Sequence, residues 1–287
     1  MLSSIVHKFK KFRQKIFSCF HARSDALMEL MDALAGNLTA RSVVQLSLNP
    51  AFRRQYGSIH DAISNFAVEP TQDADIEQCL IEQCSPTTTT QPFHLIVLDC
   101  TAAPRKYANT LNDRGMVYAP TIIPGNKPVT VGHQYSIMGF LPEQAPENEN
   151  IPWMLPLSTR RVATETNGII VGARQLKAAM SHLTKELTVI LGDTAYSSPH
   201  FIHEVQQHEN AVLIARLKSN RVFQNKATPK QPKITNRPER GHELWYGDKF
   251  KLKYASTWGE PDQVIEVPFL TRKGKQFTDI FKGGIIC

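Results

Sequence analysis

The sequence predicts an α/β protein in which an all-helical segment precedes a mixed β-sheet with flanking helices. Three observations support this fold class. Helical periodicity dominates residues 1–84, apolar runs at 94–98 and 187–191 have the composition of buried strands, and helical patterns separate the later strands. Alternation of strands with helices is typical of the parallel strands in an α/β sheet.

The N-terminal segment contains several short helical patterns. Residues 2–20 place Ile and Phe at helical spacing among lysines, which predicts a basic amphipathic helix. Such a helix packs its apolar stripe on a neighbouring helix, the commoner use, or lies on a membrane surface. Arg53 and Arg54 lie among the short helices, and we predict that they contact DNA. Further helices are expected over residues 25–35, 40–47, 58–66 and 73–83.

Residues 85–92 are predicted to be a linker. The segment begins Ser85-Pro86 and continues with four threonines, so it has no large apolar side chain to bury. Beyond it, the apolar run at 94–98 begins the predicted sheet. The remaining elements are expected as strands at 116–123, 133–141 and 154–161, a helix at 167–183, a strand at 187–191, a helix at 199–208 and a strand at 211–217. This order is that of the ribonuclease H-like fold.

Basic residues are concentrated in two blocks. Residues 1–23 contain six Lys or Arg residues and no acidic residue, and residues 216–253 contain eleven basic and three acidic residues. Residues 95–215 contain nine basic and ten acidic residues, so this region is nearly neutral. Two basic blocks beside a neutral region suit a polyanion such as DNA, although a basic block is also typical of a solvated surface.

The cysteines and the hydropathy pattern bear on the cellular compartment. The five cysteines are odd in number and lack paired C-x-x-C spacing, which favours free thiols in a reducing cytoplasm. No apolar run approaches the roughly 20 residues that a membrane-spanning helix requires. We therefore expect a soluble, cytoplasmic protein with no membrane partner.

Two predicted strands each end in an aspartate. Asp99 follows the run at 94–98, and Asp193 follows the run at 187–191 after one glycine. If these strands are neighbours, their ends lie side by side, where ligands of open α/β sheets collect. A buried carboxylate requires a cation to offset its desolvation. We therefore predict that Asp99 and Asp193 are catalytic residues that bind divalent metal, although such an aspartate is often only a turn residue or helix cap.

Divalent metal bound by carboxylates suits phosphodiester chemistry. Two ions about 3.5–4 Å apart activate an attacking oxygen and stabilise the leaving oxygen. Mg²⁺, or Mn²⁺ in its place, takes few carboxylates and leaves positions for water and phosphate oxygens. Arg105, Lys106, Arg160 and Arg161 are expected to hold the DNA backbone near this site.

Several motifs resemble the DDE transposases related to the type-four insertion-sequence group. The helical opening, at residues 40–48 and 52–56, is similar to the N-terminal domain of these enzymes, and the resemblance covers about residues 5–266. The motifs of the sheet region are Asp99-Cys100-Thr101 followed by Arg105, Gly132-His133-x-Tyr135-Ser136, and Asp193-Thr194-Ala195-Tyr196-Ser197.

The resemblance implies a ribonuclease H-like core that uses its two aspartates to bind divalent metal for DNA hydrolysis and strand transfer. It also implies DNA at the element ends as the partner and a homo-oligomer of the complete enzyme. Thr101, His133 and Tyr196 are expected near the site. The implied domains are a helical DNA-binding domain at 1–84, a linker at 85–92, an incomplete catalytic core at 93–217, and a basic loop with a truncated β-rich insertion at 218–287.

One departure from the family pattern concerns the third acidic residue. The family's glutamate lies in a Tyr-x-x-Arg-x-x-x-Glu-x-x-x-x-x-x-Lys arrangement, which has no match here. We therefore expect a truncated copy with little or no transposition activity. Two alternatives are a catalytically inactive DNA-binding protein derived from a transposase and a ribonuclease H-like nuclease of another family that uses Glu204. The remaining candidates for the third acid are Glu209, Glu239, Glu243, Glu260 and Glu266.

Overall fold

The computed structural model forms two compact units, residues 1–215 and 216–287, which are described separately. In the described part of the chain, no helix is both long enough and apolar enough to cross a membrane. The residues that the structure describes are 2–66, 70–84, 87–88, 91–119, 128–143, 153–183, 186–226, 246–257, 263–270 and 276–283.

Helices joined by turns make up the described residues up to 84. The C-terminal half of the first helix packs its apolar stripe on other helices, so Ile16 is only 2% exposed, whereas Phe9 nearer the N-terminus is 57% exposed. The contact pattern places these helices in the same unit as the sheet, and a separate N-terminal domain stays a prediction. The five helices are α1 (Leu2–Cys19), α2 (Ser24–Ala35), α3 (Val43–Leu46), α4 (Tyr56–Phe66) and α5 (Pro70–Ile81).

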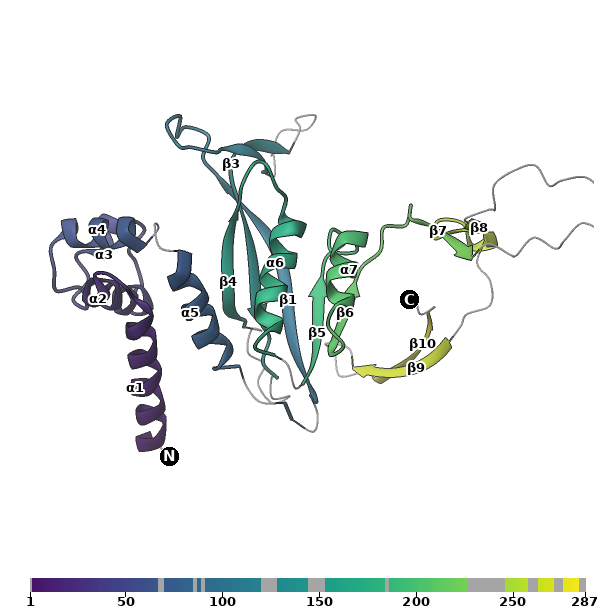
Figure 1. Ribbon diagram of the computed structural model, residues 1–287, viewed down its shortest axis with the longest axis horizontal. Helices are drawn as coiled ribbons and strands as arrows, with labels where there is room; N and C mark the ends of the chain where they lie inside the picture. Colours follow the sequence, from purple (N-terminus) through teal and green to yellow (C-terminus); the bar gives the residue numbers. More distant parts are fainter. Residues whose placement is uncertain are drawn as a thin grey trace, which may run out of the picture. The chain divides into compact units, whose positions relative to one another are not determined.

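A six-stranded mixed sheet follows, with helices between its later strands (Figure 1). Its spatial order is β2-β3-β1-β5-β6, and β4 also pairs with β3. The mixed α/β class predicted from the sequence is therefore confirmed. The elements are β1 (Phe93–Pro104), β2 (Gly115–Tyr118), β3 (Val129–Phe140), β4 (Leu155–Val162), α6 (Gly168–Met180), β5 (Leu187–Gly192), α7 (Pro199–Gln206) and β6 (Ala211–Ala215).

The long strand β3 organises the antiparallel half of the sheet. One edge of β3 pairs with β1. The other edge pairs first with β2, at residues 129–132, and then with β4, at residues 134–140. Two short strands thus share one edge of β3, while β1 joins this half to the parallel strands β5 and β6.

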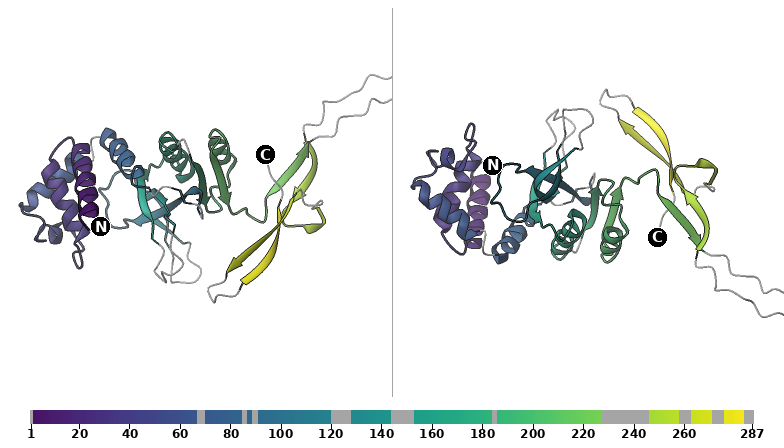
Figure 2. Two further views of the ribbon diagram at one scale, coloured as in Figure 1. Left: turned by 90° about the horizontal axis from the view of Figure 1, so that it is seen from below. Right: turned by 90° about the horizontal axis from the view of Figure 1, so that it is seen from above.

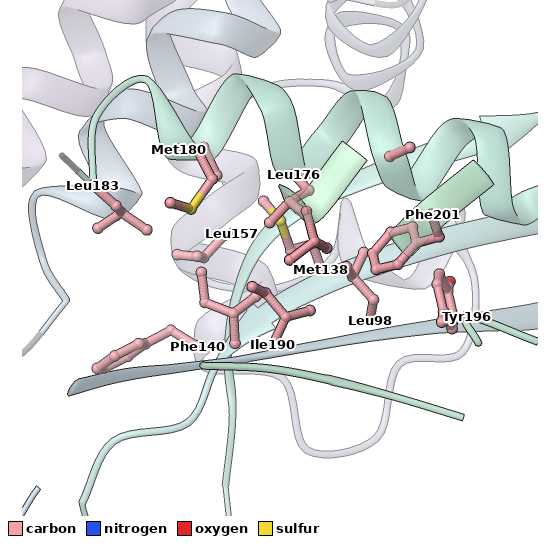
Figure 3. Packing of buried hydrophobic residues seen from close by; sticks show 14 of the residues in the cluster. Leu98, Met138, Phe140, Leu157, Leu176, Met180, Leu183, Ile190, Tyr196 and Phe201 are labelled. Carbon is pink, nitrogen blue, oxygen red and sulfur yellow. The ribbon is translucent and has the colours of Figure 1, made fainter. Parts of the chain in front are cut away.

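Helices α6 and α7 lie on the same face of the sheet (Figure 2). Alternate residues of β1 point toward them, so Ile96 and Leu98 are buried in the main core. Figure 3 shows Leu98 in this core. Leu176 of α6 and Phe201 of α7 fill the other side of this core and are both 0% exposed. Both helices begin at capping side chains, because Asn167 and Ser198 accept hydrogen bonds from the first backbone N–H groups.

The second unit contains two antiparallel strand pairs. β7 (Val222–Lys226) pairs with β8 (Tyr246–Lys251), and β9 (Gln263–Leu270) pairs with β10 (Gln276–Gly283). A short 3₁₀ helix, η1 (Ala255–Thr257), follows β8. Most of the predicted basic loop, residues 227–245, lies outside the described residues.

Candidate metal-binding site

The two predicted aspartates follow neighbouring strands. β1 and β5 run parallel, and Leu98 paired with Gly192 is the last pair between them. Asp99 and Asp193 come directly after this pair, so both backbones carry an aspartate at the same level of the sheet. The condition on which the predicted site depends, that the two strands are neighbours, is therefore met.

The setting of Asp99 differs from the expectation in two ways. β1 does not end before Asp99 but continues to Pro104, because β3 still pairs with it there and Asp99 lies opposite Ile137. Asp99 is also exposed, as is Asp193, so neither carboxylate is buried. The expectation that a buried carboxylate requires a cation to offset its desolvation therefore does not apply to these two aspartates. A cation at this position is attracted by two solvated charges instead.

Each carboxylate uses one oxygen in a local hydrogen bond. Asp99 Oδ1 accepts from the Cys100 backbone N–H at 2.7 Å, and Asp193 Oδ1 accepts from the Ala195 N–H at 2.8 Å. Within the described residues, neither carboxylate forms an ion pair with Lys, Arg or His. Two such carboxylates fit Mg²⁺, which binds proteins through one or two carboxylates and retains several waters.

The candidates for a third metal ligand do not cluster with Asp99 and Asp193 in the described part of the chain. Among the described residues, no three His, Cys, Asp or Glu side chains form a cluster suited to a metal ion. Glu204 lies on α7 and faces His208 of the same segment, with Oε1 3.7 Å from Nε2. Of the other candidates, Glu209 lies in the turn after α7, and Glu266 lies in β9 of the second unit. The remaining three, Glu239, Glu243 and Glu260, lie outside the described residues.

Tyr196 fixes the segment that carries Asp193. Its side chain is 2% exposed and packs edge-on against Phe201 with ring centroids 5.0 Å apart (Figure 3). Burial raises the pKa of the Tyr196 phenol, and its hydroxyl lies 3.5 Å from Cys100 Sγ. Gly172 of α6 makes room for the ring, because a Cβ atom there would lie 3.0 Å from Tyr196 Cε1. Tyr196 therefore lies under the site.

Thr101 and His133 lie farther along the same pair of strands. Thr101 is exposed and, two residues after Asp99, lies on the same face of β1. His133 is opposite Ala103 in the β1–β3 pairing. Its Nε2 atom is 2.9 Å from the Asn112 carbonyl oxygen, so this nitrogen is occupied by a loop of the same chain.

Arg105 and Lys106 remain available for a polyanion. Both are exposed and follow the last residue of β1, on the strand that carries Asp99. The Arg105 guanidinium donates to the Pro104 carbonyl oxygen, and Lys106 Nζ lies 5.4 Å from the centre of the Tyr107 ring. Neither forms an ion pair with an acidic residue of the described chain.

The other four predicted DNA contacts are engaged by acidic side chains. Arg161 lies 2.7 Å from the Asp113 carboxylate. Arg53 and Arg54 both face Glu29, at 3.0 and 3.3 Å, and Glu29 is 7% exposed. Arg160 pairs with Asp73 and Glu77 of α5. These guanidinium groups hold the helical segment and β4 in place. Their acidic partners lie 24 to 87 residues away, so no local sequence pattern indicates them.

Sequence reasoning also missed the polar residues behind the site. Gln175 of α6 is 4% exposed and bonds to Ser136 of β3 and Ser158 of β4. One indication was present in the sequence. Gln175 falls four residues after Val171 and four before Ala179, so a polar side chain interrupts the buried stripe of this helix.

A comparison with known protein families identifies one match. The family model described as DDE superfamily endonuclease matches residues 15–277. The match therefore includes both aspartates and most of the helical segment. No curated protein matches the chain.

Proposed function

This chain belongs to the DDE superfamily of endonucleases, and from that premise we propose that it is a DNA transposase related to the type-four insertion-sequence group. In this proposal Asp99 and Asp193 bind Mg²⁺ or Mn²⁺ and serve phosphodiester hydrolysis and strand transfer. The supporting observation is the parallel pairing of β1 with β5, which places two exposed carboxylates directly after the last paired residues.

The residues of the chain have separate tasks in this reaction. A bound divalent metal would supply charge neutralisation and an activated water at the scissile phosphate. Asp99 and Asp193 would hold this metal from two neighbouring strands. In each carboxylate the local hydrogen bond uses only Oδ1, so Oδ2 can bind the metal. Thr101 lies beside Asp99 on the exposed face, where its hydroxyl can donate to a phosphate oxygen.

DNA is held by charge in this proposal. Arg105 and Lys106 extend from the end of β1 without acidic partners among the described residues, so both can contact phosphates next to the site. The basic block at residues 1–23 adds charge from the helical segment. The element ends as the target and a homo-oligomer as the active form are part of the same proposal.

Cleavage of labelled DNA by the purified full chain tests the reaction. Asp99→Asn and Asp193→Asn keep an oxygen for the local backbone hydrogen bond but remove the charge. Because no third acidic ligand joins this pair among the described residues, we expect slow Mn²⁺-dependent nicking by the wild type. We expect each variant to lower that rate by about 100-fold or more, because an essential electrostatic contact is lost. Asp75→Asn, an exposed aspartate on α5, is the matched control and should cleave like the wild type. Equal nicking by Asp99→Asn would contradict the proposal.

DNA binding without cleavage is the second candidate. The observation in its favour is that each carboxylate accepts a backbone hydrogen bond, as in the turn role expected of an aspartate after a strand. A gel-shift assay with and without Mg²⁺, run beside the cleavage assay, separates the two. Binding that does not depend on metal, with no nicking in Mg²⁺ or Mn²⁺, favours the inactive DNA-binding protein.

A further inference from the structure

A chain of buried polar side chains leads from beneath the aspartate pair to α5. Its central member is Gln175 of α6. The Ser136 hydroxyl donates to Gln175 Oε1 at 2.7 Å, and Gln175 Nε2 donates to the Ser158 hydroxyl at 2.9 Å. Ser158 donates in turn to the carboxylate of Glu77. Ser136, Ser158 and Gln175 are each at most 4% exposed, so water does not compete for these bonds.

One end of this chain touches both segments that carry the aspartates. Ser136 lies directly opposite Cys100 in the β1–β3 pairing, and Cys100 follows Asp99. The Tyr196 hydroxyl, which belongs to the turn after Asp193, lies 3.5 Å from Cys100 Sγ. The same group of side chains therefore supports the backbone beside Asp99 and the turn after Asp193.

The other end is held on α5 by charge. Glu77 has a side chain that is only 12% exposed, and it faces the Arg160 guanidinium, which also pairs with Asp73. Burial raises the pKa of Glu77, while the bonds from Ser158 and Arg160 oppose that rise. Arg160 lies on β4, opposite Ser136 in the β3–β4 pairing. Helix α5 is thus fastened to the sheet at the point where the polar chain ends.

The direction of the hydrogen bonds is set by the acceptor at this end. A carboxylate only accepts, so Ser158 must donate to it, which leaves the Ser158 oxygen to accept from Gln175. The amide oxygen of Gln175 then accepts from Ser136. Hydrogen bonds in a buried chain polarise one another, and loss of one member leaves its neighbours unsatisfied. The hydroxyl of Ser136 therefore depends on a carboxylate oxygen on another helix.

We propose that Gln175 is a positioning residue that couples the seating of α5 on β4 to the geometry of the aspartate pair. Displacement of α5 frees the Ser158 hydroxyl, disturbs Gln175 and Ser136, and loosens the turn that follows Asp193. The role of the aspartates as metal ligands rests on the proposed function, whereas the coupling itself is a property of the fold.

Two substitutions of Glu77 test the coupling in the full chain. Glu77→Gln and Glu77→Leu both remove the charge that faces Arg160, but only Gln keeps an oxygen for the Ser158 hydroxyl. Amide hydrogen exchange at Ala195 and Tyr196 reports on the turn after Asp193, since both amides donate to Asp193. We expect exchange about tenfold faster in Glu77→Leu and in Gln175→Met, and wild-type exchange in Glu77→Gln.

Mn²⁺ binding provides the second measurement. Substitution of groups that orient metal ligands costs about 10-fold or more in metal affinity, so we expect a dissociation constant raised about tenfold in Glu77→Leu and Gln175→Met. Asp75→Asn on the same helix is the control and should change neither measurement.

The outcomes separate this inference from the proposed function. Equal amide exchange rates in Glu77→Leu and Glu77→Gln would overturn the coupling. An Asp75→Asn variant that exchanges as fast as Glu77→Leu would also overturn it. A wild-type chain that binds no Mn²⁺ would overturn the metal role, and the exchange rates would still decide the coupling.

Discussion

Tyr196 packs directly against Gly192, the last residue of β5. A Cβ atom on Gly192 would lie 2.6 Å from Tyr196 Cβ and 3.0 Å from Tyr196 Cγ. The backbone after Asp193 therefore turns back on the strand that precedes it, and the Tyr196 ring enters the core beneath the two aspartates. This close approach requires glycine, because any side chain would push the turn away.

We predict that Gly192→Ala lowers the free energy of unfolding by about 1–3 kcal/mol, the usual cost of overpacking. The contacted atoms belong to the first carbons of Tyr196, which cannot rotate away. Chemical denaturation measures the effect. Gly57→Ala in α4 is the matched control, because a methyl group there meets nothing within 4 Å. It should stabilise the chain by up to about 1 kcal/mol. A neutral Gly192→Ala would show that the turn has room to move.

The ring and the hydroxyl of Tyr196 are predicted to contribute different amounts. Tyr196→Phe removes only the polar contact with Cys100 and should cost about 0.5–1.5 kcal/mol. Tyr196→Ala leaves a cavity beside Phe201 and should cost about 3–5 kcal/mol. Denaturant titration of both variants checks the difference. Equal losses would mean that the hydroxyl, rather than the packed ring, stabilises this region.

Glu77 is predicted to make stability depend on pH. Burial raises its pKa above the usual 4.5, so the folded chain holds a proton where the unfolded chain has released it. The free energy of unfolding therefore falls as pH rises from the unfolded pKa through the folded pKa, and this contribution is constant above it. Glu77→Gln lacks this titration. Unfolding measured from about pH 4 to pH 8 should show the wild type losing stability relative to Glu77→Gln across that window. A constant difference would contradict the assignment.

Arg105 and Lys106 are predicted to contact DNA phosphates. Substitution of either residue by Gln should weaken binding to all DNA sequences about equally and reduce the slope of log affinity against log salt by about 1. Lys177→Gln on α6 is a control of the same charge change at an exposed position. Fluorescence anisotropy at several salt concentrations measures the slopes. Unchanged slopes in both variants, or the same change in Lys177→Gln, would remove these residues from the DNA surface.

Several features of the fold followed from the sequence because they depend on local periodicity. The apolar runs before Asp99 and Asp193 formed strands, and the stripe of residues 167–183 formed α6. Burial of alternate or helically spaced side chains is a property of short segments, and it requires no knowledge of distant partners. The adjacency of β1 and β5 was only a condition of the predicted site, and the tertiary structure decided it.

The acidic partners of the arginine side chains could not be predicted from local sequence patterns. Arg53, Arg54, Arg160 and Arg161 each face an acidic residue of the same chain, and their contact with DNA stays a prediction. A sequence shows where a positive charge is available but not whether a distant carboxylate already neutralises it. The exposure of Asp99 could not be predicted from the sequence either, because it depends on where β5 ends while β3 continues to pair with β1.

The sequence by itself determined the mixed α/β class and the two apolar runs that lead to Asp99 and Asp193. The tertiary structure decided which cations remain for a polyanion and how the aspartates are supported from beneath. The physical reason is the range of the forces involved. Backbone conformation and side-chain periodicity are set within a few residues, whereas the bonds from Ser136 through Gln175 to Glu77 exist only when β3, β4, α5 and α6 pack together.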